Sequence, residues 1–221
     1  MIKRSSLKFS GITPRYYHSR PHYLVIMVKT PKAGAVKTRL SRDIGVARAT
    51  SFYRHLCSGI IKRLSASTKW QTLLAVSPDL DVCHPFWNAV HTITQGRGDL
   101  GQRMQRVFND LPPGPVVIIG TDIPEITLQH ISDAFVKLGN HDVVLGPADD
   151  GGYWLVGQNR MPRVLSLFEN VRWSSEFTLQ DTLKNTANAR VALLDILRDV
   201  DTAKDYYDLR YKASRCLLPF D

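Results

Sequence analysis

The stretch 116–124, VVIIGTDIP, decides the fold, and the stretch 143–153, VVLGPADDGGY, has a similar pattern. In each, a short apolar run is followed directly by a turn that carries glycine and aspartate. Such apolar runs are typical of strands that are buried on both faces of a parallel sheet. Because open α/β sheets bind ligands at the carboxyl ends of their strands, both stretches are expected to deliver a carboxylate to a ligand-binding edge.

Strand and helix patterns alternate along the rest of the chain. Further strands are predicted at 23–28, 73–77, 91–94 and 153–156. Helices are predicted at 46–64, 100–108, 128–138, 174–183 and 202–211, and residues 29–40 are expected to form a loop. This alternation predicts an α/β fold with a mostly parallel, Rossmann-like sheet and helices on both faces.

The composition is that of a globular protein with one domain. The chain has 221 residues, of which 43% are hydrophobic and 22% charged, and we expect one domain over 23–221 after a basic extension at 1–22. No apolar run approaches the roughly 20 residues that span a bilayer, and residues 1–22 lack the apolar centre of a secretory signal. Three scattered cysteines, Cys57, Cys83 and Cys216, predict reduced thiols and a cytoplasmic location.

Positive charge is concentrated at the start of the chain. The net charge is +9, and Asp43 is the one acid among residues 1–48. Such a field favours an anionic partner, which is a nucleotide, a nucleic acid or a membrane surface, and a solubilising tail is the alternative.

The segment between the first strand and the first long helix combines glycine with cations. In nucleotide-binding α/β folds this is the place of the phosphate loop. Gly34 allows a close backbone approach, Lys29 and Lys37 are suited to neutralise phosphate charge, and Arg39 is suited to grip two oxygens. The segment is not a Walker A loop, since Val36 stands where that motif needs glycine. A basic surface loop is the alternative.

Residues 96–101, GRGDLG, match the spacing G-x-G-x-x-G. A dinucleotide fingerprint is disfavoured, because the preceding strand is short and polar and Asp99 would repel a pyrophosphate. The alternatives are a turn in which Asp99 caps the next helix, and a turn in which Gly98, Asp99 and Gly101 lie against a nucleotide.

Several carboxylates are candidate ligands of a hard divalent ion. Asp122 follows a strand, and Pro124 fixes the backbone so that this carboxylate faces the sheet edge. Asp199 and Asp201 are the later candidates, although Asp122 and Asp201 are each also placed to cap a helix.

The turn 149–154, DDGGYW, suits a hydroxyl-rich ligand. The adjacent carboxylates of Asp149 and Asp150 repel each other, so they are expected to face solvent, a cation or hydroxyl groups. Tyr153 is placed either to stack on a sugar or base or to join the core. Trp173 precedes Ser174, which is a good helix N-cap.

These pieces occur in one order over about residues 23–210. They are VKTPKAGAVKTRL at 28–40, GDLGQRM at 98–104, GTDIP at 120–124, GPADDGGYWLVG at 146–157, VRWS at 171–174 and DVDT at 199–202. In this arrangement the chain resembles the DUF2064 family, a glycosyltransferase-like group similar to nucleotide-diphospho-sugar transferases of GT-A fold. The resemblance implies that the loop at 29–39 holds nucleotide phosphates and that 98–101 lies near the base. It also implies that Asp122 binds the metal, joined by Asp199 or Asp201.

We therefore expect a Mg²⁺- or Mn²⁺-dependent transferase that uses a nucleotide-activated donor, first of all a nucleotide sugar. Lys37 and Arg39 would stabilise the leaving group, Asp150 would act on the acceptor, and Asp149, Tyr153 and Trp173 would line its site. The acceptor is a small molecule or is linked to a lipid, nucleic acid is disfavoured as a partner, and a homodimer is left open.

Two alternatives remain at this point. One is a nucleotidyltransferase that joins a nucleoside triphosphate to a small phosphorylated acceptor and releases pyrophosphate. The other is a non-catalytic nucleotide or nucleic-acid binder. Both catalytic hypotheses require that the cations of the 29–39 loop and the carboxylate of Asp122 meet at one pocket.

Overall fold

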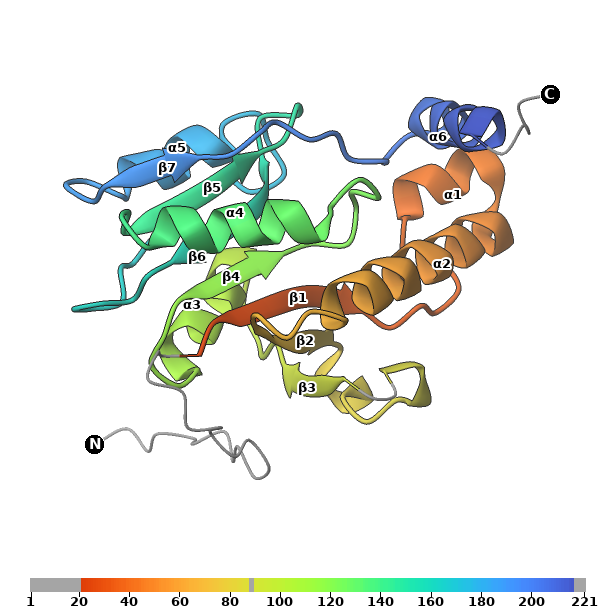
Figure 1. The fold of residues 1–221 in the computed structure, drawn as a ribbon. Helices are drawn as coiled ribbons and strands as arrows, with labels where there is room; N and C mark the ends of the chain where they lie inside the picture. The colour runs from red at the N-terminus through yellow and green to blue at the C-terminus, as the bar shows by residue number, and fades with distance from the viewer. Residues whose placement is uncertain (1–20, 88–89, 217–221) are drawn as a thin grey trace.

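A computed structural model describes residues 21–87 and 90–216, with side chains up to Tyr211. Within these residues, one sheet of seven strands runs through the molecule and helices cover both of its faces (Figure 1). Nearly all of the predicted basic extension lies outside the described residues. None of the described helices combines the length and the apolar character that crossing a membrane requires.

The strand order in the sheet is β3-β2-β1-β4-β6-β5-β7. The strands are β1 Tyr23–Lys29, β2 Gln71–Ser77, β3 His91–Thr94, β4 Val116–Ile119, β5 Val143–Pro147, β6 Tyr153–Gln158 and β7 Val191–Leu193. Only β6 runs antiparallel to its neighbours, and it lies between β4 and β5. Since β6 opposes both, β4 and β5 point the same way, and their carboxyl ends lie at the same sheet edge. The predicted mostly parallel sheet is therefore confirmed.

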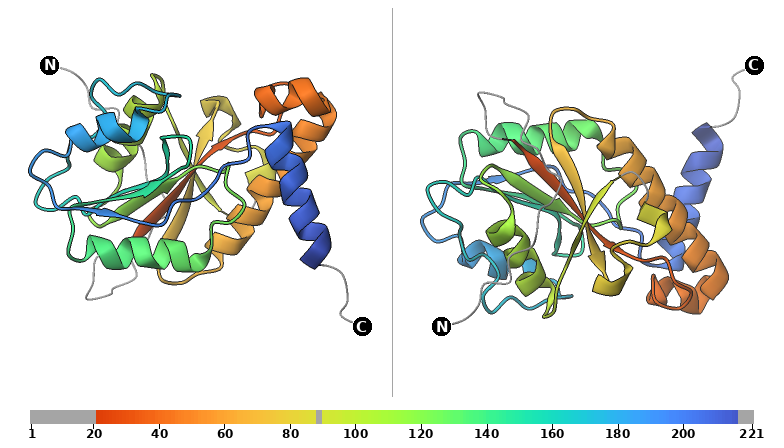
Figure 2. Two further views of the ribbon diagram at one scale, coloured as in Figure 1. Left: turned by 90° about the horizontal axis from the view of Figure 1, so that it is seen from above. Right: turned by 90° about the horizontal axis from the view of Figure 1, so that it is seen from below.

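Helices lie on both faces of the sheet, as predicted (Figure 2). They are α1 Thr38–Ile44, α2 Val46–Ser65, α3 Leu100–Asp110, α4 Leu128–Leu138, α5 Thr178–Lys184 and α6 Ala203–Cys216. The helices α2 and α4 pack on one face of the sheet, and α3 and α5 pack on the other. The helix α6 packs beside α1 and α2, where the Tyr206 ring lies edge-on to Phe52 and packs against the buried cluster of Leu40, Ile44 and Ala49.

The central strands are buried on both faces because they alternate between two apolar layers. In β1, Leu24 and Ile26 join the layer under α2 and α4, while Tyr23 and Val25 join the layer under α3. Each of these four residues is at most 2% exposed. Burying a side chain of this size stabilises the fold by about 1.5–3 kcal/mol.

Two helices begin with a side-chain cap, and the cap at Asp99 is one of the two alternatives that the sequence left open. The Asp99 carboxylate accepts a hydrogen bond from the backbone N–H of Gln102, and Thr127 caps α4 in the same way. In both cases the third residue of the helix bonds back to the cap, which completes a capping box. The short segment 79–81 forms a single turn of 3-10 helix.

Three sequence predictions need correction. The helix α1 begins at Thr38, inside the predicted loop, and it was missed because its apolar side chains occupy only two turns. The predicted helix at 174–183 begins at Thr178, and Ser174 is not its cap, because Phe177 takes that position. The strand β7 was not predicted, since its three residues are too few for a pattern. Cys57 is buried and Cys83 exposed, both as free thiols, and the side chain of Cys216 lies outside the described residues.

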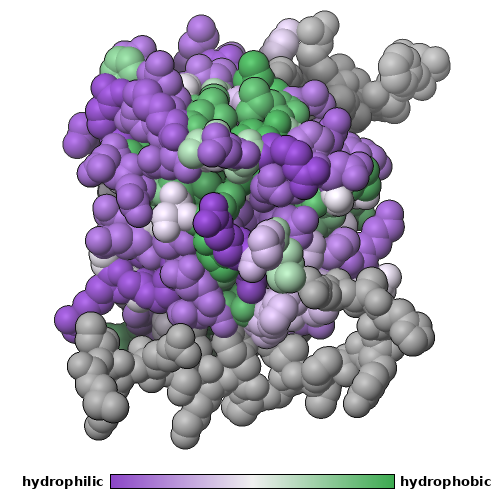
Figure 3. All heavy atoms as spheres, turned by 90° about the vertical axis from the view of Figure 1, so that its left-hand side faces the viewer, coloured by the Kyte–Doolittle hydropathy of each residue, from purple (hydrophilic) through white to green (hydrophobic). Residues whose placement is uncertain are grey.

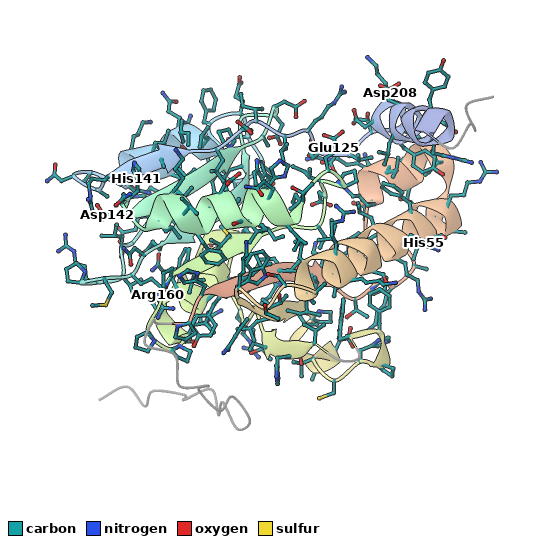
Figure 4. All side chains as sticks on the ribbon, viewed as in Figure 1. His55, Glu125, His141, Asp142, Arg160 and Asp208 are labelled. Atoms are coloured by element: carbon teal, nitrogen blue, oxygen red, sulfur yellow. The ribbon has the colours of Figure 1, made fainter. Side chains whose placement is uncertain are left out.

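The end of the molecule opposite to the carboxyl edge of the sheet is mostly hydrophilic. One hydrophobic strip crosses its centre (Figure 3). This end carries His141 and Asp142, whereas Glu125, in the loop after β4, lies toward the other end (Figure 4).

Candidate active site

Two adjoining cavities lie at the carboxyl edge of the sheet. The first has a volume of about 630 Å³ and is lined by the ends of β1 and β4 and the start of α3. The second has a volume of about 510 Å³ and is lined by the turn after β5 and the loop before α5. Both are lined by Arg39, Asp122, Ser174 and Asp201, so these residues stand at their common boundary. A third cavity, beside Asp142 and Arg160, lies at the opposite end of the sheet and contains none of the predicted site residues (Figure 4).

Lys37 joins the phosphate-loop segment to the predicted carboxylates. Its Nζ lies 2.7 Å from Asp122 Oδ1, 2.8 Å from Asp201 Oδ1 and 2.6 Å from the carbonyl oxygen of Val200. The side chain is only 5% exposed. The loop cation and the carboxylate after β4 therefore meet at one pocket, as the catalytic hypotheses require.

Lys37 has an unusual backbone conformation and a raised side-chain pKa at this position. Lys37 precedes α1 with φ 46° and ψ 47°, a left-handed conformation that is costly for a residue with a side chain. Burial lowers the pKa of Lys37, but the carboxylates of Asp122 and Asp201 outweigh it and raise the pKa overall. The side chain is therefore an ammonium held by two carboxylates.

Three further cations line the first cavity. Lys29 is exposed at the end of β1, and Arg39 is 73% exposed, with its Nη1 3.7 Å from Asp201. Arg103 was missed from the sequence, although it lies in the GDLGQRM segment. Its Nε donates to the carbonyl oxygen of Gly98 at 2.9 Å and its Nη1 to Gln95 Oε1 at 3.3 Å. Its position one turn into the capped helix α3 was the available signal.

The glycines of the predicted phosphate loop (29–39) and of the predicted base-binding turn (98–101) do not all line a cavity. Gly98 and Asp99 line the first cavity, and Asp99 also caps α3. Gly34 and Gly101 line neither of the two cavities. At Gly101 a side chain would meet the rings of Trp173 and the β-carbon of Phe168, so this glycine permits close packing of α3.

The second cavity is acidic. Its charged lining consists of one cation, Arg39, and five carboxylates, which are Asp122, Asp150, Glu176, Asp199 and Asp201. Burial and the neighbouring carboxylates of Asp201 and Asp150 raise the pKa of Asp199 to about 6. The first cavity, in contrast, is lined by four cations and three carboxylates, so cations predominate there and carboxylates predominate in the second cavity. Glu176 was missed because a lone acid in a loop carries no pattern.

The wall of the second cavity is built from two segments that pack tightly. Gly151 has φ +85°, and a side chain there would fall on the backbone of Glu176. The carbonyl oxygen of Gly151 accepts a hydrogen bond from the N–H of Leu179 at 3.0 Å. Arg172 fixes the same loop through two hydrogen bonds to Asp181, of 2.7 and 2.9 Å, and these hold the pKa of that carboxyl well below its usual range.

The two adjacent aspartates face different surroundings. Asp150 Oδ1 accepts the N–H of Gly152 at 2.8 Å, and Asp150 lines the second cavity. Asp149 lies 3.5 Å from Arg198 and lines neither of the two cavities. Tyr153 lines both cavities and also packs against the core, and its burial raises the pKa of the phenol.

The carboxylate oxygens of the second cavity are the type of ligand that a divalent ion prefers. Mg²⁺ and Mn²⁺ prefer carboxylate oxygens, and Asp122, Asp199 and Asp201 provide them around one cavity. Burial first, and then the negative charge of Asp201 and Asp150, raise the pKa of Asp199, and a cation would compensate that charge. Among the side chains that the structure describes, in residues 21–87 and 90–211, no three acidic, histidine or cysteine side chains are already arranged to hold an ion. The ammonium of Lys37 now lies between two of the carboxylates.

The chain has the nucleotide-diphospho-sugar transferase fold, and its similarity to the proteins described next places it among the transferases. The chain belongs to the DUF2064 family, whose model, described as an uncharacterized protein conserved in bacteria, matches residues 60–175. A provisionally named nucleotide-diphospho-sugar transferase from Desulfovibrio desulfuricans G20 superposes with a TM-score of 0.80 and 29% identity, over 89% of each chain.

Two more distant proteins are also similar to this chain. The 2-phospho-L-lactate guanylyltransferase of Methanocaldococcus jannaschii is 25% identical over 129 residues, which are 58% of this chain and 56% of that protein. The chain thus matches little more than half the length of this relative. The glucosyl-3-phosphoglycerate synthase of Mycobacterium tuberculosis, solved with Mn²⁺, UDP and phosphoglyceric acid, shares the fold, with a TM-score of 0.53 and 9% identity over 91% of this chain and 80% of that chain.

Proposed function

We propose that the chain transfers a group from a nucleotide-activated donor, a nucleotide sugar first of all, to a hydroxyl group of an acceptor. The observation that carries this proposal is the division of charge between the two cavities. Lys29, Arg39 and Arg103 face the first cavity, whereas carboxylates dominate the second. An anionic donor is favoured in the first cavity and a hydroxyl-rich acceptor in the second.

In the first cavity the chain would bind and orient the donor. The side chains of Lys29, Arg39 and Arg103 supply positive charge for the diphosphate, and this charge stabilises the leaving nucleoside diphosphate. Gly98 and Asp99 lie on the same wall and would contact the nucleoside.

In the second cavity the chain would position the acceptor. Asp150 is exposed, and we assign it the proton of the attacking hydroxyl, with Tyr153 and Trp173 as the apolar walls of the site. Carboxylates are acceptors of hydrogen bonds, so a row of them suits several hydroxyl groups. Asp149, which is paired with Arg198, would act only at the rim.

A Mg²⁺ or Mn²⁺ ion belongs to this proposal. Asp122, with Asp199 or Asp201, would hold it, and their carboxylate oxygens are suitable ligands. When bound, the ion would add Lewis-acid stabilisation to the diphosphate oxygens. The support for this assignment is the kind of side chain present and its place at the boundary of the two cavities.

Nucleotidyl transfer is the second candidate, and the name of the M. jannaschii relative favours it. The first cavity would then hold a nucleoside triphosphate, and pyrophosphate would leave. A phosphorylated acceptor would face the five carboxylates of the second cavity, and for this reason we place nucleotidyl transfer second.

The identity of the leaving group separates the two reactions. The protein is incubated with Mn²⁺, with each nucleotide sugar or each nucleoside triphosphate, and with neutral or phosphorylated acceptors. Release of a nucleoside diphosphate from a nucleotide sugar, stimulated by a neutral acceptor, supports the proposal. Pyrophosphate release from a triphosphate replaces it with nucleotidyl transfer. Nucleotide binding that is steeply salt-dependent and survives Asp122→Ala, without either product, indicates a non-catalytic binder.

A further inference from the structure

Lys37 differs from the other cations of the site in what it contacts. The side chains of Lys29 and Arg39 are exposed on the first cavity, whereas the Lys37 side chain is 5% exposed and surrounded by oxygens. Its three contacts are to Asp122, Asp201 and the carbonyl of Val200, at 2.6–2.8 Å.

These contacts use the whole hydrogen-bonding capacity of the ammonium. A lysine ammonium has three N–H donors, and here three acceptors lie within hydrogen-bond distance. No donor is left for a phosphate while this arrangement persists. Lys37 also lines the first cavity, where the phosphates of a nucleotide would lie, so the two uses of the ammonium exclude each other.

The same oxygens are the ones assigned to the divalent ion. Asp122 and Asp201 come from segments far apart in the chain, and without a cation their charges would repel each other. Asp199 adds a third carboxylate to the same neighbourhood, and Arg39, at 3.7 Å from Asp201, is the nearby cation on the exposed side. An ammonium held between the carboxylates is thus a substitute for the ion.

We infer that Lys37 is an exchangeable counter-ion, which holds Asp122 and Asp201 in place until a divalent ion takes these oxygens and releases the ammonium to the first cavity. This inference rests on the proposed function for the identity of the ion and of the phosphate ligand. It predicts that lysine and metal compete for the carboxylates in the absence of any nucleotide.

The test compares Lys37→Met with Lys29→Met in the presence of Mn²⁺ alone. Both variants remove one positive charge from the first cavity, but only Lys37 contacts the carboxylates. Free Mn²⁺ is counted by its electron paramagnetic resonance signal. Lys37→Met should bind Mn²⁺ at least tenfold more tightly than the wild type, and Lys29→Met should stay within threefold of it. An unchanged or weaker affinity in Lys37→Met, or an equal gain in both variants, overturns the inference.

Thermal unfolding gives a second signature of the same exchange. Without Mn²⁺, Lys37→Met should melt below the wild type, because two carboxylates lose their cation. Saturating Mn²⁺ should raise the melting temperature of Lys37→Met by more than that of the wild type. An equal shift in the two proteins contradicts the exchange.

Chemical labelling of lysines in the wild-type protein tests the same exchange without relying on the folding of Lys37→Met. An amine-reactive acetylating reagent, followed by mass spectrometry, reports how accessible each lysine is. Lys37 should react slowly alone and at least threefold faster with Mn²⁺, while Lys29 should not change. Protection of Lys37 that Mn²⁺ leaves unaltered overturns the inference. These measurements use no donor or acceptor, so a failure of the transfer assay does not change their outcome.

Discussion

The Lys37 ammonium lies 2.7 Å from the Asp122 carboxylate, and this contact joins the loop after β1 to the loop after β4. Asp201 reaches the same ammonium from the segment before α6. Three segments that are far apart in the sequence thus meet at the boundary of the two cavities.

The first prediction concerns the two adjacent aspartates. Asp150→Asn removes the group assigned to the acceptor proton, so kcat should fall about 100-fold, the scale of general-base catalysis. The affinity for the nucleotide donor should stay unchanged, because Asp150 lines only the second cavity. Asp149→Asn is the matched control, and it should keep kcat within threefold. Equal losses in the two variants would exclude the role given to Asp150.

The second prediction tests Arg103 as a phosphate-binding residue. Replacing Arg103 by Met removes a charged donor from the first cavity, and nucleotide affinity should fall about tenfold, as expected for one charge-assisted hydrogen bond. Arg42→Met is the control, since Arg42 is exposed on α1 and lines neither cavity. Isothermal titration calorimetry measures both affinities. A comparable loss in Arg42→Met would mean that only net charge matters.

A third prediction concerns the wall of the second cavity. Gly151→Ala places a methyl group against the backbone of Glu176 at a positive φ, and it should destabilise the protein by about 2–4 kcal/mol. Gly34→Ala also has a positive φ, but nothing lies within 4 Å of the added carbon, so its cost should be about 1 kcal/mol. Urea denaturation of both variants measures the difference. An equal loss of unfolding free energy in the two variants would show that the backbone of Glu176 does not exclude a side chain at position 151.

A fourth prediction concerns pH and Asp199. Its pKa in the folded protein is about 6, above the ordinary value of 3.8, so the folded state binds this proton more tightly than the unfolded state does. The contribution of Asp199 to stability therefore falls as the pH rises from about 4 to about 6, and it stays low above that range. In the presence of a chelator, Asp199→Asn should raise the melting temperature at pH 7.5 and leave it nearly unchanged at pH 4. The same gain at both pH values would contradict the raised pKa.

Much of the fold was predictable from the sequence because the signals are local. Buried strands such as β4 appear as continuous apolar runs, and α2 shows its apolar side chains at helical spacing. The cap at Asp99 was predictable for the same reason. The misses are short or depend on tertiary contacts. Neither α1 nor β7 is long enough to show a period, and the first turn of α5 is held by the hydrogen bond from the N–H of Leu179 to the carbonyl oxygen of Gly151, which is distant in the sequence.

The sequence was enough to predict which residues belong to the candidate site, but not which side chains they contact. Because Lys37 and Asp122 both follow predicted strands, the sequence placed them at the same edge of the sheet. The contact of Lys37 with Asp201 depends on the path of the chain after β7. The ion pair of Asp149 with Arg198 has the same long-range origin. Arg103 was missed although its place one turn into the capped helix α3 was visible in the sequence, because its position over the first cavity follows from the docking of that helix.

Whether metal and nucleotide share one site can be measured by calorimetric titration of nucleoside diphosphates, one base at a time, into the wild type and Asp122→Asn. We expect Mn²⁺-dependent binding of at least one nucleotide to the wild type, because the carboxylate and the cations share one pocket. In Asp122→Asn this affinity should fall at least tenfold. Binding of the same strength in both proteins, with or without Mn²⁺, would contradict a shared site.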